Sequence, residues 1–201
     1  MLYFFPNKPN LITINSHIVR EKSDDSNWWA EIKKNGSRLC LRKDKEEACK
    51  HKSFNGFIFW NRHKQLLSYE PSQELLEELY TLKIPEGTHI DAELLHHKTK
   101  NIKHLIYVYD IYMHNGKQIT ETLEVRRKII EDIFCNNYKH FVLSKLYFND
   151  FENVFNKAII QSENEGLVLK SKQGKIAWDL KKCQEVWWQL KIRKPCGSYS
   201  F

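Results

Sequence analysis

Hydrophobic and polar residues alternate in several short segments, and this period of two is typical of half-buried strands. The strands predicted in this way are residues 28–32, 39–42, 57–60, 65–69, 89–95, 105–112, 141–148, 166–170, 176–180 and 186–193. Turn-forming residues, Lys34 to Ser37, separate the first two of them. We therefore expect this first pair to form a hairpin.

A period of three to four residues predicts three amphipathic helices, at residues 72–82, 120–134 and 151–159. Ser72 is a suitable N-cap for the first of them. Because the helices fall between pairs of strands, without strict alternation, the pattern indicates an α+β fold with mainly antiparallel sheets. No repeat or long linker interrupts the chain, so we expect a single domain over residues 1–201.

The charge of the chain favours a polyanionic partner. The 201 residues carry a net charge of +7, with 41% hydrophobic and 28% charged residues. Residues 166–201 hold eight lysine or arginine residues against two acids, so most of the excess lies near the C-terminal end. The apolar stretch at the N-terminus is too short for a signal peptide. We therefore expect a cytoplasmic protein that does not enter a membrane.

Cysteine and glycine spacing exclude several kinds of site. The five cysteines are an odd number without a CxxC pair, which argues against a disulfide framework and against a thiolate zinc site. The seven glycines form neither a GxGxxG nor a GxxxxGK[ST] loop. If the protein binds a nucleotide, side chains must hold its phosphates.

One lysine stands out as a candidate nucleophile. Lys33 ends a predicted strand, Gly36 follows at the bend, and Glu31 lies two residues earlier on the same strand face. A nucleophilic lysine must lose its proton, which requires cationic neighbours, a metal ion or burial. Taken alone, the segment is better explained as a solvated hairpin turn.

Four later segments change this interpretation. They are residues 90–94, 107–110, 165–170 and 188–195. With residues 31–38, they resemble motifs I, III, IIIa, IV and V of the covalent nucleotidyltransferase superfamily, in the order of that family. The superfamily contains ATP-dependent DNA ligases, RNA ligases and mRNA capping guanylyltransferases. The resemblance covers about residues 28–195 and implies a nucleotidyltransferase fold, an ATP-grasp-like adenylation domain.

This resemblance implies a role for each matching residue. Lys33 would be the catalytic residue that attacks the α-phosphorus of ATP and holds AMP as a lysyl phosphoramidate. The residues that would bind the nucleotide are Glu31, Arg38, Glu93, Tyr109, Lys170, Lys191 and Arg193. Among them Tyr109 would stack on adenine, and the cations would neutralise phosphate charge.

The resemblance also implies contacts with a metal ion and with nucleic acid. Glu93 and Glu165 would bind Mg²⁺ or Mn²⁺, because these ions prefer carboxylate oxygens together with phosphate and water. Arg62 and Lys172 would contact nucleic acid. Each residue also has an ordinary structural explanation, and Tyr109 alone is more typical of a core. The order of the motifs is what favours the functional interpretation.

The expected function is an ATP-dependent DNA ligase that joins 3′-OH and 5′-phosphate ends at nicks. Arg38 after the lysine supports DNA, whereas Asn35 in motif I is more typical of RNA ligases, and Ala92 replaces the glycine of motif III. The alternatives are an RNA ligase, a capping guanylyltransferase and a non-catalytic nucleic-acid-binding module.

The expected partner is a nicked DNA or RNA-containing duplex, bound by a monomer. Little chain follows motif V, so we expect no OB-fold domain within residues 1–201. Either the basic surface grips the substrate alone or a separate protein supplies the clamp.

Overall fold

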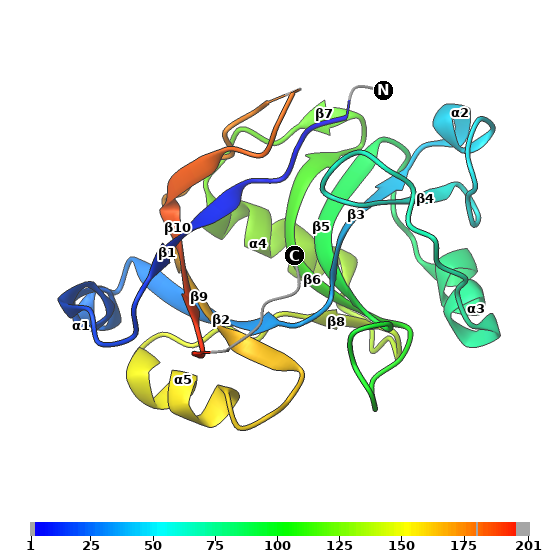
Figure 1. Cartoon of the computed structure of the whole chain (residues 1–201). Coiled ribbons are helices and arrows are strands. Elements are labelled where there is room, and N and C mark those ends of the chain that lie inside the picture. The colour runs from blue at the N-terminus through cyan, green and yellow to red at the C-terminus, as the bar shows by residue number, and fades with distance from the viewer. Residues whose placement is uncertain (1–2, 180, 196–201) are drawn as a thin grey trace.

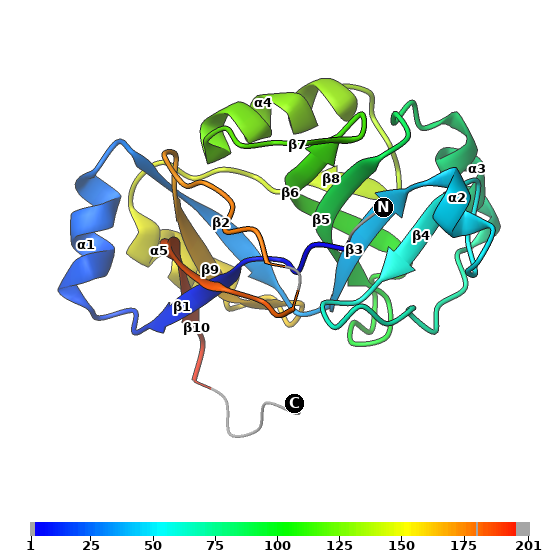
Figure 2. The ribbon, with the colours of Figure 1, turned by 90° about the horizontal axis from the view of Figure 1, so that it is seen from above.

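The computed structural model describes residues 3–179 and 181–195, which form two β-sheets (Figures 1 and 2). The strand order of the first sheet is β1 (Lys8–Ile12), β10 (Glu185–Arg193), β9 (Asn164–Ser171) and β2 (Trp28–Lys34). That of the second sheet is β4 (Phe57–Trp60), β3 (Ser37–Lys43), β5 (Thr88–Leu95), β6 (Leu105–His114) and β7 (Lys117–Gln118), and β8 (Phe141–Leu143) also pairs with β6. Apart from β1–β10 and β6–β8, the strand pairs of the described residues are antiparallel, which confirms the predicted α+β class.

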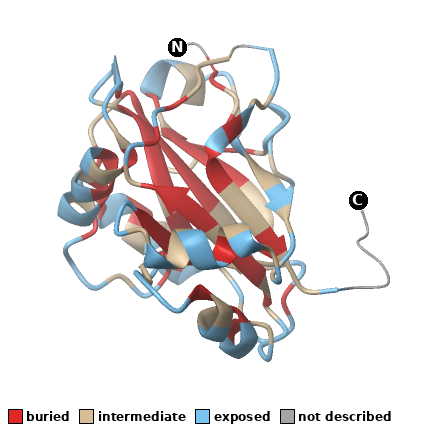
Figure 3. Cartoon of the chain, turned by 90° about the vertical axis from the view of Figure 1, so that its left-hand side faces the viewer, coloured by how far each residue is buried: buried red, intermediate tan, exposed pale blue. Residues whose placement is uncertain are grey.

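Helices pack on both sheets. They are α1 (His17–Asp24), α2 (Lys45–Ala48), α3 (Gln73–Thr81), α4 (Leu123–Ile133) and α5 (Phe151–Ala158). The apolar sides of α1 and α5 cover the first sheet, and those of α3 and α4 cover the second. Figure 3 shows the result, with buried residues along the strands and exposed residues on the outer sides of the helices. No helix among the described residues is long and apolar enough to cross a membrane.

The sequence explains where α3 begins and which side it buries. Ser72 is its N-cap, and the Ser72 side chain accepts a hydrogen bond from the backbone N–H of Leu75 at 3.3 Å. Leu75 and Leu79 lie one turn apart and are fully buried against the second sheet. The predicted helix at residues 72–82 is therefore confirmed.

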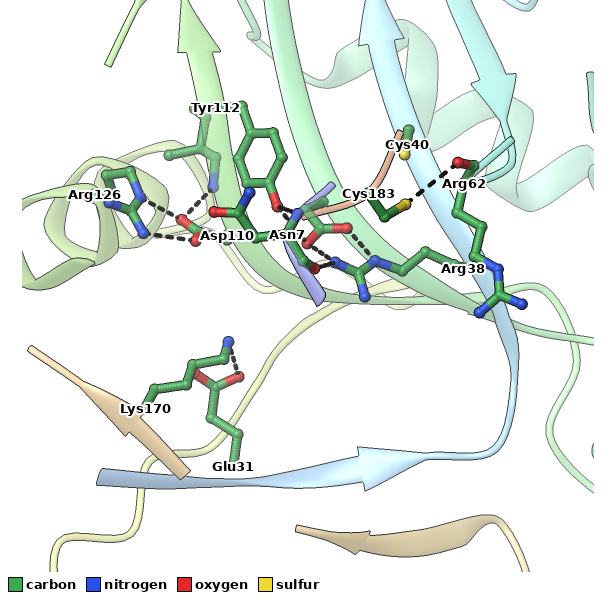
Figure 4. Close-up of polar contacts among 12 residues, drawn as sticks. Asn7, Glu31, Arg38, Cys40, Arg62, Asp110, Tyr112, Arg126, Lys170 and Cys183 are labelled. Atoms are coloured by element: carbon green, nitrogen blue, oxygen red, sulfur yellow. Dashed lines mark hydrogen bonds and ion pairs between the residues drawn. The ribbon is translucent and has the colours of Figure 1, made fainter. Parts of the chain in front are cut away.

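Alternation along the strands separates an apolar face from a polar face in each sheet. In β3, Leu39 and Leu41 enter the core under α3, whereas Arg38 and Cys40 point the other way. In β2, Ala30 packs towards α5, and the residues beside it in the sequence face the opposite side. The two polar faces lie on the sides of the sheets away from these helix-covered cores. Figure 4 shows polar side chains of both sheets pointing into the space between them.

The predicted hairpin at residues 34–37 is wrong. Strands β2 and β3 are consecutive in the chain, yet β2 pairs with β9 and β3 pairs with β4 and β5. The bend between them is tightly packed, because a Cβ on Gly36 would lie 2.7 Å from the backbone oxygen of Leu94 in β5. The bend therefore carries the chain from one sheet to the other and places Lys33 at the junction.

Three other strand predictions also need correction. Residues 65–69 form no strand, since only Leu66 makes an isolated bridge, to Trp60. Residues 176–179 are irregular, and Leu180 lies outside the described residues. The strand predicted at 141–148 ends at Leu143. Conversely, β1 and α1 were not predicted, and β1 lies at the edge of the first sheet.

Candidate active site

The first sheet aligns the candidate residues in rows across its strands. Lys33 in β2 is paired with Gly166 in β9, and Gly166 is paired with Arg193 in β10. In the next row, Glu31 and Lys191 lie on either side of β9. Directly paired residues of an antiparallel sheet point to the same face. The register therefore brings parts of motifs I, IV and V together on one face of the first sheet.

Lys33 is held by a carboxylate of motif IV. Its Nζ lies 2.5 Å from Glu165 Oε2, and Arg193 Nε lies 3.3 Å from the same oxygen. The side chains of Lys33 and Glu165 are only 17% and 14% exposed, so water screens this contact weakly. Lys191 lies near Arg193 and Lys33, and burial together with these positive charges lowers the pKa of Lys191.

A second ion pair lies deeper in the same face. Lys170 Nζ donates a hydrogen bond to Glu31 Oε2 at 2.9 Å, and their side chains are 5% and 1% exposed. Trp29 Nε1 donates to the other carboxylate oxygen of Glu31 at 3.1 Å. Lys170 Nζ also lies 5.4 Å from the centre of the Tyr109 ring in β6. This contact joins the first sheet to the second across the site.

On the second sheet, Arg38 and Glu93 are directly paired on β3 and β5. The Arg38 guanidinium forms a bidentate ion pair with Asp91 and does not project freely into the site. Glu93 Oε1 accepts a hydrogen bond from the backbone N–H of Gly36 at 3.1 Å. Burial raises the pKa of Glu93, while the positive charges of Lys33 and Arg38 act in the opposite direction.

Tyr109 lies beside these groups with a half-buried ring. It contacts the ring of Tyr107 edge to face, with 5.4 Å between the ring centres. Burial raises the pKa of Tyr109 well above its ordinary value, so the phenol is neutral at physiological pH. An aromatic ring on the polar face is compatible with base stacking, and its contact with adenine stays a prediction.

A buried ion pair holds α4 against β6 (Figure 4). Arg126 in α4 binds both carboxylate oxygens of Asp110 in β6, at 2.8 and 2.9 Å, and the two side chains are 0% and 1% exposed. Arg126 Nη1 also donates to the backbone oxygen of Gly174 in the segment that follows β9. Through this side chain the strand that carries Tyr109 is tied to the sheet that carries Lys33.

The N-terminal segment closes one end of the space between the sheets. The backbone N–H of Asn7 donates to the hydroxyl of Tyr112 at 2.8 Å, and the Asn7 side chain exchanges two hydrogen bonds with the backbone of Ala177. The backbone oxygen of Asn7 accepts a hydrogen bond from Arg38. The orientation of Arg38 therefore depends on a residue far from motif I.

Two predicted nucleic-acid contacts do not join this group. Lys172 follows β9 at the end opposite Gly166, about 20 Å along the strand, and its Nζ lies 5.9 Å from the centre of the Phe148 ring. Arg62 is exposed in the turn after β4, and its backbone oxygen lies 3.7 Å from Cys183 Sγ. Their roles stay predictions.

Asp91 is the site residue that the sequence analysis missed. It lies two residues before Glu93 on the same face of β5, is fully buried, and holds Arg38. The alternation of β5 already placed both carboxylates on one face. The spacing of two residues between Asp91 and Glu93 was the available signal, although it does not reveal the contact with Arg38.

The carboxylates can be tested for their fit to a metal ion. Glu93 and Glu165 lie close enough for the charge of Glu165 to affect the pKa of Glu93. Within residues 3–179 and 181–195, no group of three or more His, Cys, Asp or Glu side chains forms a ready cation site. One or two carboxylates completed by substrate phosphates and water are what Mg²⁺ commonly uses. The residues therefore fit a metal ion that arrives with a nucleotide.

Three solved structures that are similar in fold are DNA or RNA ligases. A mycobacterial DNA ligase D bound to ATP and MES superposes with a TM-score of 0.64 at 15% identity, over 94% of this chain and 60% of the other. A Lig E DNA ligase gives a TM-score of 0.60 at 11% identity, over 94% and 68% of the two chains. An archaeal ATP-dependent RNA ligase gives 0.55 at 12% identity, over 94% and 48%.

These identities show the fold alone, and this chain spans 60% of the length of the mycobacterial ligase chain. No curated protein matches this chain in sequence. The profile of the ATP-dependent DNA ligase domain family, however, matches residues 11–191, which include motifs I to IV and the first half of motif V. The chain therefore belongs to the ATP-dependent DNA ligase domain family.

Proposed function

We propose that this protein is an ATP-dependent ligase that forms a covalent adenylate on Lys33 and seals nicks in duplex DNA. The observation that carries the proposal is the position of Lys33 at the crossing between the sheets. There its amine contacts Glu165, and Arg193 and Lys191 lie beside it. A lysine among cations, two carboxylates and a tyrosine ring suits attack on a phosphate of a bound nucleotide.

In the proposed reaction, the neutral amine of Lys33 attacks the α-phosphorus of ATP. A phosphorus–nitrogen bond forms, the bond to the bridging oxygen breaks, pyrophosphate leaves, and the nitrogen loses a proton to water. Lys191 and Arg193 neutralise the charge that develops on the phosphate oxygens. The AMP then passes to a 5′-phosphate, and attack by the 3′-OH joins the ends and releases AMP.

Two carboxylates of the chain would serve the metal ion. Bound Mg²⁺ or Mn²⁺ would neutralise phosphate charge, with Glu93 and Glu165 as its protein ligands. In the free protein, Glu165 instead balances the charges of Lys33 and Arg193. The Lys33 amine is thereby positioned and kept from unwanted reactions until a nucleotide binds.

Labelling with ATP tests the nucleophile. Wild-type protein incubated with Mg²⁺ and ATP labelled at the α-phosphate should acquire a covalent label that survives denaturation. Lys33→Arg should acquire none, although it keeps a cation opposite Glu165, because a guanidinium stays protonated. The control is Lys34→Ala, which removes the neighbouring lysine, bound to Asn164 at 2.8 Å, and should keep the label.

The labelling results can contradict the proposal in two ways. Wild-type protein without label would contradict the proposal, and so would equal labelling of Lys33→Arg. Preferential labelling by GTP would indicate a guanylyltransferase instead.

RNA joining is the second candidate, supported by Asn35 in motif I and by the similarity in fold to the archaeal RNA ligase. Nicked duplexes with DNA or RNA on each side of the nick separate the two functions. We expect the fastest sealing with DNA on both sides. Faster sealing of RNA ends would favour the second candidate.

A further inference from the structure

The loop between β5 and β6 carries many basic residues and no acid. Its residues, His96 to His104, include three lysines and three histidines, and we call this segment the basic loop. The loop leaves β5 directly after Leu95, whose side chain a Cβ on Gly36 would approach to 2.8 Å. Figures 1 and 2 both show the loop beside the crossing from β2 to β3. It therefore lies next to the segment that carries Lys33.

Hydrogen bonds within the basic loop fix its shape. Thr99 is buried, and its hydroxyl donates to the backbone oxygen of Ile102 at 2.5 Å. Lys103 Nζ donates to the backbone oxygens of His96 and Thr99, at 2.6 and 2.7 Å. One lysine is thus used to brace the loop.

The other two lysines are available to a partner. Lys98 and Lys100 are exposed on the two sides of Thr99, and neither has an ion-pair partner within 4.0 Å among the described residues. Two exposed positive charges on a braced loop, next to the segment that carries Lys33, fit a polyanion. DNA on either side of a nick presents such phosphates a short distance from the reacting ends.

We propose that the basic loop binds the phosphate backbone of duplex DNA beside the nick, through Lys98 and Lys100. The inference rests on the proposed function and adds a named substrate-binding surface to it. Backbone contacts of this kind position the duplex without reading its sequence. The loop would hold the DNA while the nick lies at Lys33.

The test measures binding without catalysis. A fluorescent nicked DNA duplex is titrated with protein in EDTA, without ATP, at salt concentrations from 50 to 200 mM. Loss of two phosphate contacts reduces the slope of log K against log salt by about 1.8. For Lys98→Ala/Lys100→Ala we expect this change and at least about a tenfold loss of affinity at 0.1 M salt.

A matched variant controls for net charge. Lys117→Ala/Lys128→Ala removes two exposed lysines, one on β7 at the opposite end of β6 and one on α4. It should bind DNA as the wild type does. Circular dichroism and thermal unfolding of both double variants establish that each is folded.

Three results would overturn the inference. They are unchanged affinity and slope in the loop variant, equal losses in the two double variants, or a loss seen only with an RNA duplex. Failure of the proposed function has a different signature. In that case wild-type protein acquires no adenylate label, whatever the DNA titration shows.

Discussion

Glu165 is the residue on which the charge balance of the site depends. It contacts both Lys33 and Arg193, so one carboxylate restrains two cations from different motifs. The phosphates of a bound nucleoside triphosphate would offer Arg193 a stronger anionic partner and weaken its contact with Glu165. The contact also explains how a lysine and an arginine remain close together in the free protein.

The Glu31–Lys170 pair is almost fully buried, so its contribution to stability differs from that of the more exposed Lys33–Glu165 pair. Desolvation offsets much of the attraction in such a pair, so it contributes little net stability, although loss of one partner leaves a costly buried charge. Its position between Trp29 and Tyr109 indicates a role in fixing geometry. The pair holds motifs I and IV in register at the floor of the site.

Gly166 gives a prediction about the backbone of motif IV. Its φ of +148° is rarely adopted by other residues, and an added Cβ would lie 2.0 Å from the backbone oxygen of Ile192. Gly166→Ala should therefore lower the free energy of unfolding by roughly 3 kcal/mol or more, through backbone strain and overpacking. Urea denaturation measures the loss.

Gly116 provides the control for this substitution. It also has a positive φ, of +76°, but nothing lies within 4 Å of its added Cβ. Gly116→Ala should cost about 1 kcal/mol, from backbone strain alone. If both substitutions lower the free energy of unfolding equally, the close approach of β10 to Gly166 does not add to the loss.

Residue types and spacing alone did not identify the site. Lys33 and Glu165 are in contact but far apart in sequence, and a local pattern cannot reveal such a contact. The resemblance to a known order of motifs supplied the long-range information that periodicity cannot give, because it points to residues that meet only after folding. The pairing of Arg38 with Asp91 was missed since it depends on burial, which the sequence does not state.

At the level of elements, the start of α3 tests the capping interaction. Ser72→Ala removes the side-chain oxygen that accepts the Leu75 N–H and should destabilise the protein by about 1 kcal/mol. Thr122 is the control, because it is the N-cap of α4 and makes no side-chain capping bond. Thr122→Ala should change the free energy of unfolding by less than about 0.5 kcal/mol. A larger loss for Thr122→Ala than for Ser72→Ala would contradict this account.

The elements with strong periodicity were predicted correctly, and those that depend on distant partners were not. Helix α3 buries Leu75 and Leu79 at the expected spacing, and β5 forms at the predicted residues although nearly all of its positions are buried. Strand β1 is mostly polar, and its pairing with β10, more than 170 residues away, is what makes it a strand. Residues 65–69 have a suitable pattern, but Leu66 is exposed at the edge of β4.

For the whole molecule, a histidine buried between the sheets makes the free energy of unfolding depend on pH. His89 is fully buried between the rings of Tyr3 and Tyr112, and burial, with the nearby charge of Arg42, lowers the pKa of His89 to about 3. In the unfolded chain, histidine takes up a proton near pH 6.5. Between pH 6.5 and 3 the unfolded state therefore binds more protons, and stability falls as the pH falls.

The expected size of this effect is about 2 kcal/mol between pH 7 and pH 5. His89→Leu, which places an apolar side chain of comparable size at the same position, should lack this contribution, so its stability should depend less on pH. His63→Leu, an exposed histidine in the turn after β4, should retain the wild-type dependence. Denaturant titrations at several pH values measure both, and parallel curves for His89→Leu and wild type would refute the assignment.

The arrangement of the sheets also has a consequence for synthesis on the ribosome. The second sheet uses residues 37–143, but the first sheet joins β1 and β2 to strands that begin at Asn164, about 130 residues after β2 ends. At the usual rates of translation, β2 waits on the order of ten seconds for its partner β9. Lys33 therefore emerges early, yet Glu165 and Arg193 can reach it only after residues 165–193 have been made. Until then the nascent protein carries Lys33, the proposed nucleophile, without the charged side chains that hold its amine in the folded site.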